Sequence, residues 1–267
     1  TRTIENKRDR IATILIAPFM TCSARLPVYT LIIAAFIPNK PLLGPLLGGQ
    51  AVAMLGLYVV GFLAALATAR VLKSTILRSG HTPFMLEMPA YRWPTFKSIG
   101  LRLIDRSKIF LRRAGTVILT VAVVLWVLAH LPLTNGKAPA IADSLAGTVG
   151  RTIEPLIRPL GFNWKIGVGL VSSLAAREVI IGTLGTIYGM EGDAHSVSLQ
   201  TALHGDLTTG GACALLIFFA FAMQCMSTMA VVRRETGGWK WPAVQFTYMS
   251  TLAYVCAFLV NQTVSRL

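Results

Sequence analysis

Three apolar stretches of this sequence carry the side chains that could perform chemistry. They are FMTCSARLPVYTLIIAAF, GLVSSLAAREVIIGTLGTIYG and FAMQCMSTMAVVRRE, which begin at residues 19, 169 and 221. Each interrupts a hydrophobic run with thiol, thioether, charged or amide groups: Cys22, Arg25, Arg177, Glu178, Met223, Gln224 and Cys225. Such groups are rare in segments of this hydrophobicity and are functional candidates there. Their roles depend on the helices and breaks that position them.

The first stretch is bounded by Pro18 and Pro27, and each proline removes a helical hydrogen bond. A helix broken between them would free backbone carbonyls, which together with the Cys22 thiol could bind a cation that accepts soft ligands. Arg25 costs at least ~2.5–3.5 kcal/mol near a bilayer centre, so it should face a cavity or a partner and hold the broken ends or pair with a carboxylate. The alternative is a proline-kinked helix with an inert thiol.

The second stretch contains the adjacent charges Arg177 and Glu178. Neighbouring residues point about 100° apart on a helix, so each should find its partner elsewhere. Glu178 could supply a hard oxygen ligand or accept a proton, and the alternative is a structural ion pair between helices. Gly182 and Gly189 mark the part of this stretch where we expect a break in the helix.

The third stretch repeats a short pattern of the first. Met223-Gln224-Cys225 matches Met20-Thr21-Cys22, and paired polar interruptions in two halves of a chain are typical of transporter repeats. Methionine more often packs than binds, so Cys225 ranks above its neighbours as a metal ligand. Two further cysteines, Cys213 and Cys256, stand singly on apolar helices and are interpreted as packing residues.

Composition places these stretches in a membrane. Of the 267 residues 54% are hydrophobic and 13% are charged, and the mean hydropathy is +0.63. The net charge of +14 comes from bases between apolar segments, as in membrane proteins, so we expect lipid and no nucleic acid as a partner. The sequence contains no GxxxxGK[ST], HExxH or GxSxG motif, so it is not expected to be an enzyme.

Six apolar windows are long enough to cross about 30 Å of hydrocarbon. They lie at residues 11–37, 48–72, 114–132, 166–190, 211–232 and 243–264. Because lipid offers the backbone no hydrogen bonds, the expected fold is all-α, a polytopic bundle with broken or re-entrant helices.

Charge predicts the topology between these windows. Ten Lys or Arg residues between positions 70 and 113 indicate a cytoplasmic loop, in which Leu, Ile and Phe between bases predict an interfacial helix that leads into window 114–132. Loop 133–165 would then be extracytoplasmic. A full crossing of 166–190 would leave Arg233 and Arg234 outside, whereas a re-entrant segment keeps them inside. The acidic loop 191–208 is interpreted as solvated, with cation collection as the alternative.

The stretches TRTIENKRDRIATILIAPFMTCSARLPVYTLIIAAF, AAREVIIGTLGTIYG and MQCMSTMAVVRRETGGWKW resemble the bacterial ferrous iron transport protein B family, in order and over essentially the whole chain. Members have a cytosolic N-terminal G domain and a polytopic membrane domain with two Gate regions. The chain resembles that membrane domain from within its first Gate onward. Residues 1–72 would hold the truncated first Gate and the helix after it, 73–113 the basic loop, 114–132 a helix, 133–165 the outer loop, and 166–267 the second Gate and the last helices.

The resemblance implies Fe²⁺ transport across the bacterial cytoplasmic membrane. Its Gate cysteines correspond to Cys22 and Cys225, and its basic-Glu pair to Arg177 and Glu178. GTP and Mg²⁺ would bind only the N-terminal G domain, the expected partner of this chain, and any GTP hydrolysis would occur there. Small cytosolic accessory proteins and a second copy of the chain are further partners to expect.

Two other functions stay open at this point. Gate-type regions also occur in nucleoside-transport-like proteins, which makes a nucleoside or other solute carrier the nearest alternative, although the thiols favour a metal. The chain could instead be a non-transporting membrane scaffold that docks a cytosolic domain through its basic loop. Metal-dependent binding separates the first reading from the others.

Overall fold

The computed structural model describes residues 4, 6–38, 41, 48–75, 77, 93, 95–131, 144–174, 177–189, 197–222 and 225–266. Helices joined by turns make up this part of the chain, and none of these residues belongs to a strand. Pro41 and Gly48 form an isolated bridge. The all-α expectation is therefore confirmed.

Four stretches of the described residues are long and apolar enough to cross a bilayer. They are Lys7–Phe36, Gly49–Ser74, Thr209–Thr236 and Lys240–Val264. They match four of the six windows read from the sequence. The windows at 114–132 and 166–190 are not among them, so the count of six stays a prediction.

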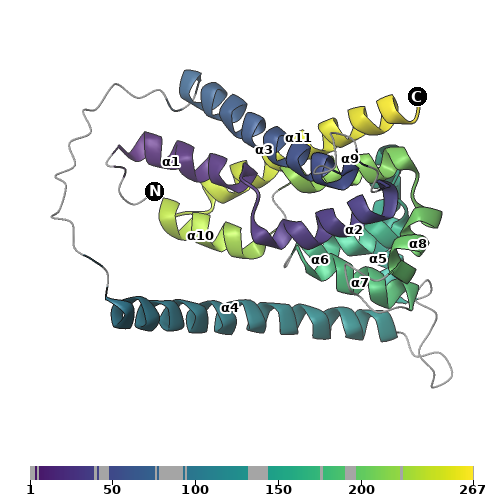
Figure 1. The fold of residues 1–267 in the computed structure, drawn as a ribbon, viewed down its shortest axis with the longest axis horizontal. Helices are drawn as coiled ribbons and strands as arrows, with labels where there is room; N and C mark the ends of the chain where they lie inside the picture. Colours follow the sequence, from purple (N-terminus) through teal and green to yellow (C-terminus); the bar gives the residue numbers. More distant parts are fainter. Residues whose placement is uncertain are drawn as a thin grey trace.

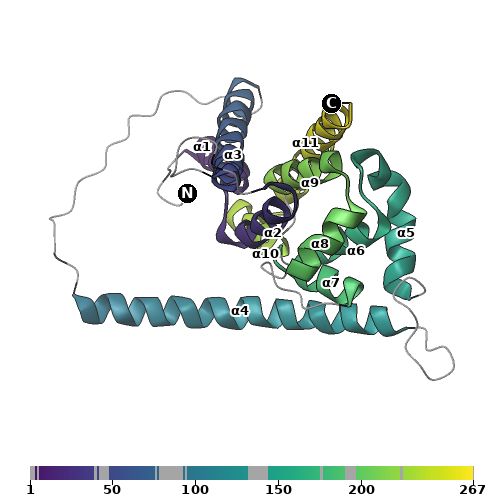
Figure 2. The same ribbon diagram turned by 45° about the vertical axis from the view of Figure 1, so that its right-hand side comes forward.

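The window at 114–132 belongs to a longer helix, α4, which runs from Phe96 to His130 without interruption. The expectation that a helix leads directly into this window is confirmed, while its placement at the membrane interface stays a prediction. The 35 residues of α4 extend about 52 Å at 1.5 Å per residue, well beyond a hydrocarbon core of about 30 Å. Figures 1 and 2 show α4 along one side of the bundle, where it contacts α5 (Leu145–Ile157) and α7 (Val179–Tyr188).

The first long stretch is broken, as its prolines predict. Helix α1 (Lys7–Ile16) continues as the short helix η1 (Ala17–Phe19), and η2 (Ser23–Arg25) leads into α2 (Leu26–Phe36). Met20 and Cys22 have extended backbones, and we call Met20–Cys22 the first break. Pro18 and Pro27 lie in the opening turns of η1 and α2, where a missing N–H costs little, so the prolines start the two pieces.

The window at 166–190 is a hairpin of two short helices, α6 (Trp164–Ser173) and α7. The two helices pack on each other, and the Thr183 hydroxyl lies 2.9 Å from that of Ser172. The predicted discontinuity is confirmed, but its predicted position between Gly182 and Gly189 is wrong. Helix α7 runs through Gly182 and ends at Gly189, where φ is +66° and glycine is favoured.

Helix α6 ends at Ser173 and α7 begins at Val179, and local hydrogen bonding accompanies the end of α6. The hydroxyls of Ser172 and Ser173 donate to the carbonyls of Gly169 and Leu170, three residues earlier, and so compete with the helical pattern at the end of α6. We call α6 and α7 together the re-entrant hairpin, after the topology expected from the sequence, and the described residues Leu174, Arg177 and Glu178 its tip.

The second broken stretch consists of α9 (Thr209–Phe221) and α10 (Met226–Thr236). Ala222 and Cys225 have extended backbones, and we call residues 222–225 the second break. Met223 and Gln224, both singled out from the sequence, lie outside the described residues. No proline stands at this break, so other contacts must supply partners to the interrupted backbone.

Two predicted loops contain helices. Helix α5 and the short helix η4 (Arg158–Leu160) lie within 133–165, and α8 (Val197–Asp206) lies within 191–208. Helix α5 packs on α6, and α8 packs on α2, so both helices surround the hairpin at one end of the bundle (Figure 2). Helices α3 (Gly49–Ser74) and α11 (Lys240–Val264) both contact α9, and α11 packs on it extensively.

Candidate functional site

The first break is held by a buried arginine. Arg25 is 1% exposed, and its guanidinium donates hydrogen bonds to the carbonyls of Pro18 at 2.7 Å and Phe19 at 3.3 Å. These carbonyls lie at the end of η1, where helix interruption leaves oxygens without a helical donor. Of the two roles that the sequence left open for Arg25, the structure therefore shows the first, holding the broken end.

Helix α11 satisfies other carbonyls next to this break, a contact that the sequence analysis missed. Gln245 is fully buried and donates to the carbonyls of Ile14 and Leu15, and the Tyr248 hydroxyl donates to Leu15 as well. The available signal was an amide near the start of an apolar window, because a buried amide requires partners.

The second break is held by Arg177 from the tip of the re-entrant hairpin. Arg177 is 4% exposed. Its guanidinium donates hydrogen bonds to the carbonyls of Phe219 at 3.0 Å and Ala222 at 2.5 Å. The tip also contacts the other side of this break, because the Met226 amide donates to the Leu174 carbonyl at 3.0 Å. The tip therefore supplies the partners that allow α9 to end without a proline.

The two breaks face each other inside the bundle. The rings of Phe19 and Phe221, which end η1 and α9, are 6.3 Å apart in an edge-to-face arrangement. Arg177 interacts electrostatically with Arg25, Cys22 and Cys225. The two breaks are thus neighbours in the fold, joined by the contact of Phe19 with Phe221.

The two thiols occupy equivalent places at this centre. Cys22 directly precedes η2, and Cys225 directly precedes α10, each as the residue that caps a helix start. Cys22 is exposed and Cys225 is half-buried, with its sulfur 2.7 Å from the Ser227 hydroxyl.

Glu178 follows Arg177 at the hairpin tip and is exposed. It directly precedes α7, and its side chain forms no capping hydrogen bond to that helix. Within the described ranges, no three His, Cys, Asp or Glu side chains are grouped closely enough to hold a metal ion. The structure therefore brings the breaks together without placing Glu178 and both thiols in one coordination sphere.

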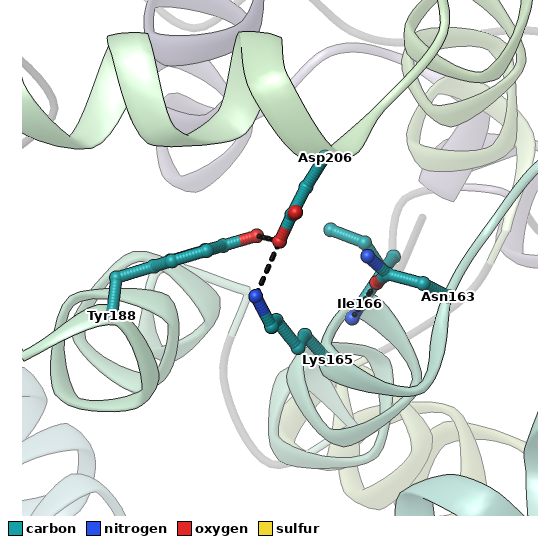
Figure 3. A network of polar contacts seen from close by, with 5 residues as sticks. All are labelled: Asn163, Lys165, Ile166, Tyr188 and Asp206. Atoms are coloured by element: carbon teal, nitrogen blue, oxygen red, sulfur yellow. Dashed lines mark hydrogen bonds and ion pairs between the residues drawn. The ribbon is translucent and has the colours of Figure 1, made fainter.

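A polar cluster at the base of the re-entrant hairpin joins its two ends to α8 (Figure 3). Asp206 Oδ2 accepts from Lys165 Nζ at 2.5 Å and from the Tyr188 hydroxyl at 2.7 Å. Burial alone would raise the pKa of the Asp206 carboxyl, but the hydrogen bonds from Lys165 and Tyr188 outweigh burial and lower this pKa. From the sequence, Asp206 was interpreted as part of a solvated loop. The opposite charges of Lys165 and Asp206, on either side of the predicted re-entrant segment, were the signal for this ion pair.

Family comparisons agree with this architecture. Residues 54–106 match the model described as ferrous iron transport protein B C terminus, and residues 111–239 match the Gate model, described as nucleoside recognition. The second match covers the re-entrant hairpin and the second break. No solved structure matches the chain.

Curated relatives match almost the whole chain. An Fe(2+) transporter FeoB of Leptospira interrogans serovar copenhageni is 44% identical over 281 residues, which cover 98% of this chain and 40% of the relative. Proteins of the same name from Leptospira biflexa and Staphylococcus aureus strain COL are 41% and 38% identical, again over 98% of this chain. The chain thus spans about two fifths of the length of these relatives.

Proposed function

Since this chain belongs to the ferrous iron transport protein B family, we propose that it forms the membrane permease part of a ferrous iron transporter. The full-length protein would move Fe²⁺ across the bacterial cytoplasmic membrane, in which this chain is a multi-pass component. It would act together with an N-terminal G domain that binds GTP and Mg²⁺. Small cytosolic accessory proteins and a second copy of the chain are further proposed partners.

The meeting of the two breaks carries this proposal. Half-helix ends and unwound backbone near the middle of a bilayer are where transporters bind ions, because lipid there offers no alternative partner. In this chain η1 ends at the first break, where η2 begins. Helix α9 ends at the second break, where α10 begins. The rings of Phe19 and Phe221 are in contact between the two breaks. A cation that passes between the two broken stretches would meet carbonyl oxygens and two thiols.

The chemistry of the side chains favours Fe²⁺ over Mg²⁺ or Ca²⁺ as the cation. Thiolates of Cys22 and Cys225 suit a borderline-soft transition metal, whereas the two lighter ions prefer oxygen ligands alone. In this proposal Glu178 adds an oxygen ligand when the hairpin tip moves toward the thiols. Arg25 and Arg177 keep the broken ends in place, and Pro18 and Pro27 start the short helices. Met223 and Gln224 stay supporting candidates from the sequence.

A nucleoside carrier is the second candidate, because the Gate model over residues 111–239 is described as nucleoside recognition. Thiols at both breaks give such a substrate no particular advantage. A scaffold without transport is the third candidate, and neither of these predicts a metal requirement.

Uptake by the full-length protein in sealed vesicles tests the proposal. Radiolabelled Fe²⁺ under reducing conditions should accumulate well above protein-free vesicles, while excess Mg²⁺ or a nucleoside should not compete. Accumulation of a labelled nucleoside would establish the carrier instead. Accumulation of neither solute, with a correctly folded protein and GTP present, would leave the scaffold as the function.

A further inference from the structure

Arg177 has a chemical environment that is unusual for a buried charge. Its guanidinium is compensated by backbone carbonyls, and no carboxylate of the described residues forms an ion pair with it. Phe219 and Ala222, which supply these carbonyls, lie at the C-terminal end of α9. A helix C-terminus carries partial negative charge, so these oxygens and the helix together form an electrostatic site for a cation.

This carbonyl site lies at the second break, at the C-terminal end of a broken helix. Unwound carbonyls and half-helix C-termini are where secondary transporters bind the small cations that drive them. In this chain the corresponding oxygens at the second break are already bound by a side chain. That side chain comes from another element, 42 and 45 residues away from its two acceptors, so its binding docks the hairpin tip against the broken stretch.

Arg25 provides the comparison within the same molecule. It is equally buried, but its acceptors Pro18 and Phe19 are only seven and six residues away, within the same broken stretch. Arg25 therefore closes one segment on itself, whereas Arg177 joins two segments. Of these two arginines, Arg177 is therefore the one whose contact depends on docking of the hairpin tip.

We propose that Arg177 is a tethered cation that occupies the carbonyl site at the second break and takes the place of a mobile coupling ion. The hairpin tip then docks on α9 without Na⁺ or any other small cation. Resting on the proposed function, the inference assigns Arg177 as a positioning residue that makes Fe²⁺ transport independent of a Na⁺ gradient. Replacing the guanidinium by a neutral side chain should make docking depend on an added cation that fits the same oxygens.

Chemical rescue tests this inference in the full-length protein in vesicles. R177A should lower Fe²⁺ uptake by about tenfold or more, since a buried site loses its charged partner, and millimolar guanidinium chloride should restore much of it. Guanidinium should also raise the Tm of purified R177A while leaving wild type unchanged. Wild-type uptake should be the same when choline replaces Na⁺. R70A, which removes an exposed arginine of α3, is the matched control and should respond to none of these conditions.

A second pair of variants guards against simple misfolding. R177K keeps a charge and R177Q does not, so R177K should transport faster than R177Q. Equal uptake by these two variants, or no response of R177A to guanidinium in uptake or in Tm, would overturn the inference. Na⁺-dependent uptake by wild type would overturn it as well. If wild type moves no Fe²⁺ at all, the proposed function fails, and the Tm of R177A with guanidinium still decides the role of Arg177.

Discussion

Lys165 lies over the ring of Tyr188, with its Nζ 4.5 Å from the ring centroid, although these residues stand at opposite ends of the re-entrant hairpin. An unbroken membrane span would place its two ends on opposite faces of the bilayer, about 30 Å apart. Their contact places the two ends of the hairpin side by side, as a re-entrant segment requires. Asp206 of α8 binds both side chains and fixes this base to the bundle.

Asp206→Asn should weaken the base of the hairpin. Partly exposed ion pairs contribute about 0.2–1 kcal/mol, so the expected loss in the free energy of unfolding is of this size. The pKa of Asp206 is lowered in the folded protein, so its stabilising contribution is present above the unfolded pKa of about 3.9 and is lost as the pH falls through the lower folded value. Unfolding of the wild type and the variant in detergent should therefore converge only at strongly acidic pH.

A double-mutant cycle with Lys165→Gln measures the same contact. The two substitutions together should cost less than the sum of their separate costs, because each removes the same interaction. Additive costs, or an equal difference between wild type and variant at every pH, would show that Asp206 does not hold Lys165 in solution.

Two glycines in the hairpin should respond oppositely to alanine. A Cβ at Gly169 would lie 2.9 Å from Cγ1 of the buried Ile180, so Gly169→Ala should separate α6 from α7 and cost about 1–3 kcal/mol. A Cβ at Gly182 would meet nothing within 4 Å, and alanine favours a helix by ~1 kcal/mol, so Gly182→Ala should be neutral or stabilising. Thermal unfolding compares them directly. Greater damage from Gly182→Ala would return the break to the position first expected from the sequence.

Arg25→Ala should destabilise the folded protein. It leaves the carbonyls of Pro18 and Phe19 without their donor, at about 1–3 kcal/mol for each buried group left unsatisfied. Arg70→Ala, at an exposed position of α3, should change stability by no more than about 0.5 kcal/mol. Equal unfolding free energies for the two variants would mean that water or another group replaces Arg25 at the first break.

The topology of the hairpin can be measured by labelling single cysteines in cells with an impermeant reagent, in a background without native cysteines. We predict that Leu145→Cys in α5 and Val197→Cys in α8, both exposed, react from the same face of the membrane. Gly238→Cys, in the turn between α10 and α11, should react from the opposite, cytoplasmic face. Labelling of Leu145→Cys and Val197→Cys from opposite faces would rule out a re-entrant hairpin.

Much of this fold could be predicted because it depends on local patterns. Apolar length located four stretches that could cross a bilayer, and the pair Pro18 and Pro27 located the first break. Counting charges around 166–190 indicated re-entry, since the cost of placing Arg233 and Arg234 outside does not depend on packing.

The features that could not be predicted from the sequence depend on contacts between distant segments. Arg177 and Leu174 bind the second break, and their partners there are more than forty residues away along the chain. The glycines near Gly182 gave a wrong position because glycine only permits a break and does not require one. Gln245 and Asp206 were missed for the same reason, since their acceptor or donor groups become neighbours only in the folded bundle.

In the proposed function, Fe²⁺ passes between the two breaks and binds Cys22 and Cys225 during transport. The most direct test is the initial rate of Fe²⁺ uptake by the full-length protein carrying Cys22→Ser and Cys225→Ser together, at membrane levels matched to the wild type. We predict a loss of at least about tenfold, the scale on which disturbed metal sites lose affinity, while Cys256→Ser stays near wild type and GTP hydrolysis remains measurable. Equal uptake by the double variant and the wild type would show that the two thiols are packing residues and would contradict the account.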